Sequence, residues 1–207
     1  MIESFSLASA HLLQDALASQ ARLRYRVFVE KRGLEHEHFD HMEYDQFDTP
    51  AAVYLVWRDT EQIVRGVARL LRTTMPYMMK TFWPYTVDDR PLPSSADIWE
   101  VTRVCVDKTF DPEVRKTIFP ELLCAISEYF EAHGIRAMVG VTRPHLLAHF
   151  VRTGISWMGK DWLIEGEMER AFFVPREHIR PVLHCEKYGL PATVLKLPAH
   201  EQQRLAA

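Results

Sequence analysis

Apolar and polar positions alternate along this chain with two periods, which predicts helices in some segments and strands in others. Apolar residues recur at helical spacing from about His11 to Gly33 and again over 114–133. Runs rich in Val, Leu and Tyr, typical of strands, occupy 51–57, 62–72, 98–106, 135–142 and 162–174. Residues 1–7 and 193–197 predict two further short strands.

Glycine and proline mark the ends of several predicted elements. Gly33 can adopt a left-handed cap conformation and end the first helix, and Gly134 stops the second. Four prolines hold residues 73–97 out of regular structure. We expect a helix over 144–153, begun by proline, and a last helix over 176–188.

The order of these elements predicts one α/β domain spanning residues 1–207. Strands first meander and then alternate with helices, which favours a mixed central sheet covered by helices on both faces, a three-layer α/β/α sandwich. The chain has 207 residues, of which 47% are hydrophobic, enough for one full core.

Charge and cysteine content narrow the classes of protein. A net charge of −3 and a pI near 6.4 argue against a general nucleic-acid-binding protein. Three cysteines without C-x-x-C spacing favour a reduced, cytoplasmic protein. We expect no signal peptide and no membrane association, because the first residues lack a basic segment and the longest apolar run is AAVYLVW.

Charged side chains of both signs gather in residues 24–48 and 98–103, which suits a ligand that carries both charges. Arg24, Val27 and Phe28 stand at i, i+3 and i+4 and therefore share one helix face. Further along come two aspartates on a loop, Asp45 and Asp48, and an acid and a base on a strand, Glu100 and Arg103.

In these segments the chain resembles the acyl-homoserine-lactone synthases, the autoinducer synthases that make quorum-sensing signals. The shared motifs are R-x-x-V-F at 24–28, E-x-D-x-F-D at 43–48, G-x-A-R-L-L at 66–71, T-x-P-Y-M at 74–78 and W-E-x-T-R at 99–103. Each motif alone is weak, but the five occur in the family's order and near its spacings. The match is close over the first half and thins beyond residue 145.

The resemblance implies an acetyltransferase-like fold and a reaction between S-adenosylmethionine and an acyl thioester. The amino nitrogen attacks the thioester carbonyl, and the carboxylate of the same molecule then displaces 5′-methylthioadenosine to close the lactone. No prosthetic group is implied. The family uses acyl carrier protein or, in a minority, acyl-coenzyme A as donor, and the sequence leaves both open.

S-adenosylmethionine presents a sulfonium, an ammonium and a carboxylate, so its site needs anions near the first two and a guanidinium near the third. Asp45 and Asp48 suit the first role, and Arg69 or Arg103 suits the second. Glu100 is the candidate base for the ammonium proton. The residues expected at this substrate are Arg24, Phe28, Leu34, Asp45, Asp48, Arg69 and Arg103, with Glu100 and Arg103 as the catalytic pair.

Glu100 and Arg103 carry a geometric expectation. Residues three apart in a regular strand point to opposite faces, so both can reach one cleft only if a bulge or strand end intervenes. We therefore predict an irregularity within residues 99–104. Backbone N–H groups where strands splay apart could stabilise the tetrahedral intermediate.

An apolar tunnel is expected for the acyl chain. Its predicted lining is Met79, Phe82, Trp99, Val104, Thr142 and Leu146, residues that could equally be ordinary core. Leu34 and Val104 stand where the family generally has tryptophan and phenylalanine, which implies a reshaped pocket or an altered donor. If a carrier protein docks, the basic candidates are Arg115, Lys116, Arg136, Arg143, Arg152 and Lys160.

Simpler roles exist for several of these residues. Asp45 and Asp48 could be turn residues, Arg24 could form a surface ion pair, and Phe28 could be core. His36, His38 and His41 lie among acids, but their spacing is not that of the H-E-x-x-H metal motif, so we expect no metal.

Two other functions remain open at this level. An N-acetyltransferase of the same fold would act on another amine, but such enzymes carry a glycine-rich arm that opens a helix, and the segment TRPHL at 142–146 lacks one. A binding module could sense S-adenosylmethionine or an acyl thioester without turnover. Release of methylthioadenosine would separate the synthase from both.

Overall fold

A nine-stranded mixed sheet forms the centre of the computed structural model, which describes residues 1–88, 90–147, 154–179, 185–186 and 188–206. Its path is β11-β1-β4-β5-β6-β7-β10-β8, and β9 pairs with β10. The pairs β1/β11 and β6/β7 are parallel, and the others are antiparallel. The strands are β1 (Ile2–Phe5), β4 (Val53–Arg58), β5 (Val64–Arg72), β6 (Ile98–Val106), β7 (Ala137–Thr142), β8 (Ser156–Trp157), β9 (Trp162–Ile164), β10 (Glu167–Pro175) and β11 (Leu195–Lys196).

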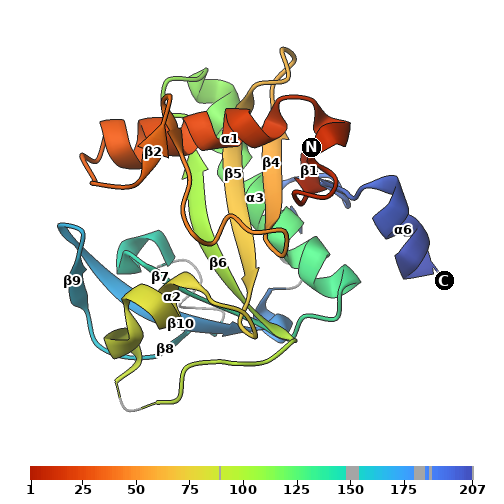
Figure 1. The fold of residues 1–207 in the computed structure, drawn as a ribbon. Helices are drawn as coiled ribbons and strands as arrows, with labels where there is room; N and C mark the ends of the chain where they lie inside the picture. Colours follow the sequence, from red (N-terminus) through yellow and green to blue (C-terminus); the bar gives the residue numbers. More distant parts are fainter. Residues whose placement is uncertain (89, 148–153, 180–184, 187, 207) are drawn as a thin grey trace.

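Two helices cover the two faces of this sheet, α1 (Ala16–Arg24) in front and α3 (Pro112–Ala132) behind in Figure 1. Each face has its own buried cluster of apolar residues. Leu122 and Ile126 of α3 pack with one cluster, and Leu23 of α1 packs with the other. The expected three-layer α/β/α sandwich is confirmed.

Strand β5 shows how the alternation of side chains places a charged residue. Ala68 and Leu70 belong to the cluster under α3, whereas Val67 and Leu71 belong to the cluster under α1. Arg69 has the same parity as Val67 and Leu71, so its guanidinium enters the α1 layer. Strand register therefore carries a cation into a buried layer.

The first predicted helix is built from three pieces. A 3-10 turn, η1 (Ala10–Leu13), precedes α1, and a π-helical segment, η2 (Tyr25–Glu30), follows it. Gly33, with φ of 67°, lies just beyond the end, as predicted. π-Helical turns inside helices occur often at functional sites, and this one carries Phe28.

Other predicted helices differ from the structure. The proline-rich segment contains α2 (Met78–Phe82) and η3 (Pro84–Val87). Neither was predicted, because the four prolines indicated irregular structure there. A C-terminal helix, α6 (Ala199–Ala206), was not predicted. The expected helices over 144–153 and 176–188 begin as η4 (Pro144–Leu147) and η5 (Arg176–His178) and then run partly outside the described residues.

Two short strands, β2 (His38–Phe39) and β3 (Met42–Glu43), form a hairpin within the acidic connection after η2. The hairpin brings Glu43 beside α1. Within the described part of the chain, no helix is long and apolar enough to cross a membrane.

Candidate active site

Three arginines and three carboxylates from different elements form one charge cluster, consisting of Arg24, Arg69, Arg103, Glu43, Asp45 and Asp48. Arg24 on α1 is fully buried. Its Nη1 and Nη2 donate to the two carboxylate oxygens of Asp48 at 2.8 and 2.9 Å. Its Nε donates to Glu43. Such fork-to-carboxylate pairs fix both partners in one orientation.

Arg69 on β5 occupies the centre of the charge cluster and is also fully buried. It donates to Asp45 at 2.6 and 2.9 Å and to Asp48 at 2.8 Å. Nε donates to the Thr102 hydroxyl, and Nη2 lies 3.2 Å from the sulfur of Met78. All five N–H groups of Arg69 thus have partners inside the protein, so none is left for a ligand.

Asp45 and Asp48 act both as turn residues and as anions. Oδ1 of Asp45 accepts the backbone N–H of Phe47, and Oδ2 of Asp48 accepts that of Asp45. The Tyr54 hydroxyl donates to Asp48 at 2.6 Å. The turn role and the charge role of these aspartates are therefore compatible, because the turn holds the carboxylates within reach of the arginines.

A bulge on β6 brings Arg103 to the same layer as Glu100. Val67 pairs with Cys105 and Arg69 with Thr102, so two residues of β6, Arg103 and Val104, oppose one residue of β5. Arg103 has φ of 53°, which is unusual for a residue other than glycine. The predicted irregularity within 99–104 is confirmed.

The cluster favours ionised carboxylates. Burial opposes ionisation of Glu43, but the hydrogen bond from His36 and the charges of Arg24 and Arg103 lower its pKa to about 2. Burial likewise opposes ionisation of Asp48, and the hydrogen bonds from Arg24 outweigh it and hold the pKa of Asp48 well below its usual range. These two carboxylates therefore stay ionised at neutral pH.

The sheet opens beside the charge cluster. Strands β6 and β7 pair only from Ile98/Ala137 to Glu100/Val139, although both strands continue further. A cavity of about 180 Å³ occupies the opening. Residues from the α1 side line it, including Phe28, Arg32, Met78 and Trp83, and so do residues from the α3 side, including Phe119, Leu123, Ile126 and Leu147. We call this space the through-sheet cavity.

Glu100 stands in the wall of the through-sheet cavity at the point where strand pairing ends. Its two carboxylate oxygens accept the backbone N–H groups of Met78 and Met79 at 2.8 and 2.7 Å. Burial raises the pKa of Glu100 to about 7, even though these two N–H groups favour the ionised form. Glu100 can therefore exchange a proton near neutral pH while it anchors α2.

A second space adjoins the first on the side of the acidic loop. This cleft, of about 420 Å³, shares Met78, Trp83, Arg103 and Glu165 with the through-sheet cavity. It is otherwise lined mainly by polar groups: Glu35, His36, Glu37, Glu43, Asp45 and Gln46, with Phe82. We call it the acidic cleft. Arg103 thus stands between an anionic space and a largely apolar one.

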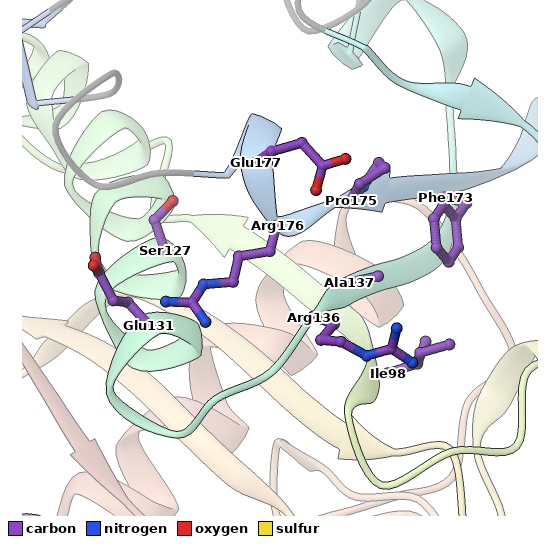
Figure 2. Close-up of a pocket in the computed structure, with 9 residues that line it drawn as sticks. All are labelled: Ile98, Ser127, Glu131, Arg136, Ala137, Phe173, Pro175, Arg176 and Glu177. Atoms are coloured by element: carbon purple, nitrogen blue, oxygen red, sulfur yellow. The ribbon is translucent and has the colours of Figure 1, made fainter.

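A separate hollow of about 590 Å³ lies at the other end of the strand pair, where β6 and β7 begin (Figure 2). Arg136 and Arg176 line it together with Glu131 and Glu177, so its charges are balanced. In Figure 2 Arg176 points toward Glu131 on α3. None of the residues predicted to bind substrate lines this hollow.

Comparison with known proteins identifies the family of this chain. A family profile described as autoinducer synthase matches residues 9–173. The chain is 33% identical to an acyl-homoserine-lactone synthase of Pseudomonas aeruginosa over 181 residues, 84% of this chain and 87% of that protein. The chain belongs to the autoinducer synthase family. The family expected from the motifs, and with it an acyltransferase of the acyl-homoserine-lactone synthase class, is confirmed.

Two further relatives of this autoinducer synthase cover nearly the whole chain. An isovaleryl-homoserine lactone synthase of Bradyrhizobium diazoefficiens is 30% identical over 198 residues, 94% of this chain and 88% of that protein. The solved structure of BjaI, a coenzyme-A-dependent acyl-homoserine lactone synthase with SAM and isopentyl-CoA, superposes with a TM-score of 0.85 at 26% identity, covering 100% and 98% of the chains. An N-acetyltransferase at 18% identity and TM-score 0.56 shares the fold.

The residues predicted to bind S-adenosylmethionine occupy different depths in this synthase. Asp45 and Arg103 line the acidic cleft, and Phe28 lines the through-sheet cavity while also belonging to the core. Leu34 packs against the core cluster under α1 and lines neither space. Arg24 and Arg69 lie behind the carboxylates with no exposed surface and line neither space. Asp48 likewise faces these two arginines.

The predicted acyl-pocket residues also separate, into three groups. Val104, Thr142 and Leu146 line the through-sheet cavity. Met79 and Trp99 do not, because their side chains are buried in the core clusters on the two faces of the sheet. Phe82 lines the acidic cleft instead and packs edge-on against Phe47.

Several residues at the site escaped the sequence analysis. Glu43 lay within a recognised motif, yet it was not singled out as a partner of two arginines. His36 contacts Glu165, 129 residues later, at 3.1 Å. No short-range signal could have joined these two, nor indicated that Arg32 and Glu169 lie together.

The described basic candidates have different neighbours. Arg143 lines the through-sheet cavity and contacts Glu167 at 3.5 Å, whereas Arg136 lines the separate hollow and contacts Asp97. Lys116 pairs with Glu113, and Lys160 stacks on Trp162. Arg152 lies outside the described residues. Among those described, no group of three His, Cys, Asp or Glu side chains is arranged to hold a metal ion.

Proposed function

We propose that this protein makes an acyl-homoserine lactone, with S-adenosylmethionine in the acidic cleft and the acyl group of a coenzyme A thioester in the through-sheet cavity. One observation carries the proposal: an anionic space and an apolar space meet at Arg103, where β6 and β7 separate. A two-substrate acyl transfer needs such a meeting point, because the amine and the thioester must approach within about 3–3.5 Å.

The acidic cleft suits the charges of S-adenosylmethionine. Asp45, next to the fully buried Glu43, presents an anion to its sulfonium and ammonium groups, and Arg103 presents a guanidinium to its carboxylate. Arg24 and Arg69 hold these anions in place from behind. The arrangement is preorganised, so the ligand does not have to order the charged side chains itself.

Glu100 is the residue proposed to take the ammonium proton, directly or through one water. Its position in the cavity wall and its pKa near 7 support this role. The free amine then attacks the thioester carbonyl, and the thiol leaves. Backbone N–H groups along the unpaired stretches of β6 and β7 would stabilise the oxyanion. The carboxylate of the acylated product displaces methylthioadenosine and closes the ring.

Two observations support a short acyl-coenzyme A donor over an acyl carrier protein. The relatives include an isovaleryl-homoserine lactone synthase and the coenzyme-A-dependent BjaI. Of the basic candidates, Lys116, Arg136 and Arg143 each lie beside a carboxylate, which offsets the positive charge that an acidic carrier would meet.

The test is direct. Purified protein is incubated with S-adenosylmethionine and a panel of acyl donors, and methylthioadenosine and lactones are identified by mass spectrometry. Turnover with short or branched acyl-coenzyme A, and little with the same acyl groups on carrier protein, is the expected result. Turnover with carrier-bound donors alone would overturn the choice of donor. If no donor in the panel led to release of methylthioadenosine, the proposed function would be overturned.

A further inference from the structure

Two charged groups in the wall of the through-sheet cavity lack the hydrogen bonds that buried charges normally have. Glu169 on β10 is only 9% exposed, and within the described part of the chain its carboxylate has an ion-pair partner, Arg32, but no hydrogen-bond donor. Nη2 of Arg32 lies 3.6 Å from Oε1 of Glu169, beyond hydrogen-bond range. That Nη2 atom is buried and is itself without a hydrogen-bond partner among the described residues.

The location of this pair assigns it to one substrate. Arg32 and Glu169 line the through-sheet cavity and do not line the acidic cleft. Arg32 also packs over the ring of Phe28, with 5.9 Å between the guanidinium carbon and the ring centroid. The opposite part of the same cavity is apolar, formed by Phe119, Leu123 and Ile126 of α3. The pair is thus a polar position within the space proposed for the acyl donor.

A single ligand group could satisfy both side chains. Buried charges in folded proteins are nearly always hydrogen-bonded, and an unmade bond to a charged group is expensive. The group needed here must accept from Arg32 and donate to Glu169. A hydroxyl or an amide does both. A hydrocarbon would leave both side chains unpaired, and a carboxylate would be repelled by Glu169.

The charges around Glu169 favour a neutral ligand group. Burial raises the pKa of Glu169 to about 7, which outweighs the opposing attraction of Arg32. Glu165 and Glu167 also disfavour its ionisation, and Arg143 favours it. Glu169 therefore holds a proton for part of the time at neutral pH, and a neutral partner fits both of its states.

We propose that Arg32 and Glu169 bind a hydrogen-bonding group of the acyl donor, a hydroxyl or an amide, and select donors that carry it. The inference rests on the proposed function. The group has two sources, a hydroxyl on the acyl chain or an amide of the pantetheine arm. Both groups can accept one hydrogen bond and donate another, and the two arms of one experiment distinguish them.

The experiment compares wild type with Glu169→Gln and Arg32→Gln. Glu167→Gln is the matched control, because Glu167 lies on the same strand, its side chain is 45% exposed and it does not line the cavity. The first arm measures kcat/KM with butanoyl-CoA and 3-hydroxybutanoyl-CoA. The second arm uses the same acyl groups as S-ethyl thioesters, which lack both amides of pantetheine. Thermal unfolding confirms that each variant is folded.

Two results support the inference. If the acyl hydroxyl is bound, wild type prefers the hydroxylated donor, and either variant reduces that preference by about 10- to 100-fold, as loss of hydrogen bonds to charged groups predicts. If a pantetheine amide is bound, either variant lowers kcat/KM for both coenzyme A donors alike and leaves the S-ethyl thioesters unchanged.

Other results overturn it. Equal losses with all four donors, or no loss beyond that of Glu167→Gln, would mean that the pair has only a structural role. If wild-type protein releases no methylthioadenosine with any donor, the proposed function itself fails. This result is seen before the variants are compared, so the two failures are distinguished.

Discussion

Arg103 donates two hydrogen bonds to one oxygen of Glu43, from Nε at 3.1 Å and from Nη2 at 2.9 Å, across 60 residues of chain. The contact exists because the bulge on β6 turns Arg103 out of the face that regular alternation would give it. The same Nη2 reaches Asp45 at 3.0 Å. One guanidinium therefore ties the acidic loop to the strand that borders both substrate spaces.

Replacing Arg103 by lysine is expected to lower kcat/KM by about 100-fold, because an ammonium cannot reproduce the fork that orients both the acidic loop and the ligand carboxylate. Steady-state release of methylthioadenosine measures the effect. Arg136→Lys is the control, since Arg136 is exposed and lines the separate hollow. Equal rates in the two variants would contradict the position given to Arg103.

Glu43 makes stability depend on acid pH. Its pKa lies near 2 in the folded state, below the ordinary value of 4.5, so the unfolded chain binds more protons between these values. Stability contributed by Glu43 is therefore fully present above about pH 4.5 and is lost as the pH falls toward 2. At about 1.4 kcal/mol per pKa unit this amounts to roughly 3 kcal/mol.

The variant Glu43→Gln should thus be less stable at pH 7, because two buried guanidinium groups each lose one of their anionic partners, and its stability should fall less between pH 5 and pH 3 than that of wild type. Urea unfolding at the two pH values measures both effects. Glu61→Gln, at an exposed position, serves as control. Identical pH slopes for wild type and Glu43→Gln would rule out this role.

Catalytic rate should rise with pH through about 7 if ionised Glu100 takes the ammonium proton, because its pKa is raised to that value. In Glu100→Gln we expect this limb of the kcat profile to disappear and kcat at pH 8 to fall by about 10²–10⁴-fold. Glu169→Gln should keep the limb, although the pKa of Glu169 is similarly raised. A limb that vanishes in Glu169→Gln and persists in Glu100→Gln would reverse the assignment.

The size of the acyl group should be set by side chains that line the through-sheet cavity. Thr142→Phe fills part of a space of about 180 Å³, so we expect kcat/KM for hexanoyl-CoA to fall at least tenfold more than for butanoyl-CoA. Met79→Leu is the control, because Met79 is buried in the core and does not line the cavity. An unchanged hexanoyl-to-butanoyl ratio in folded Thr142→Phe would exclude this wall.

Local pattern was sufficient for most of the fold. Strand β6 begins and ends at the predicted residues, and α3 lies within two residues of its predicted bounds, because alternation and helical periodicity persist over many residues there. Helix α2 was missed since its five residues lie between prolines and are held by a carboxylate from a distant strand. Arg24, Asp45, Asp48, Glu100 and Arg103 were identified because they lie in three of the five short motifs.

The amino-acid sequence by itself determined the layers of the sandwich, the family and the need for a bulge near Arg103, since these follow from periodicity, motif and strand parity. Tertiary structure alone decided which charged groups face a ligand and which stand behind them. Arg69 and Arg103 are the same residue type, yet only the fold buries the first and leaves the second at the junction of two spaces. Depth and neighbours depend on contacts between distant segments, such as Glu169 of β10 with Arg32 just after η2, and no local pattern encodes them.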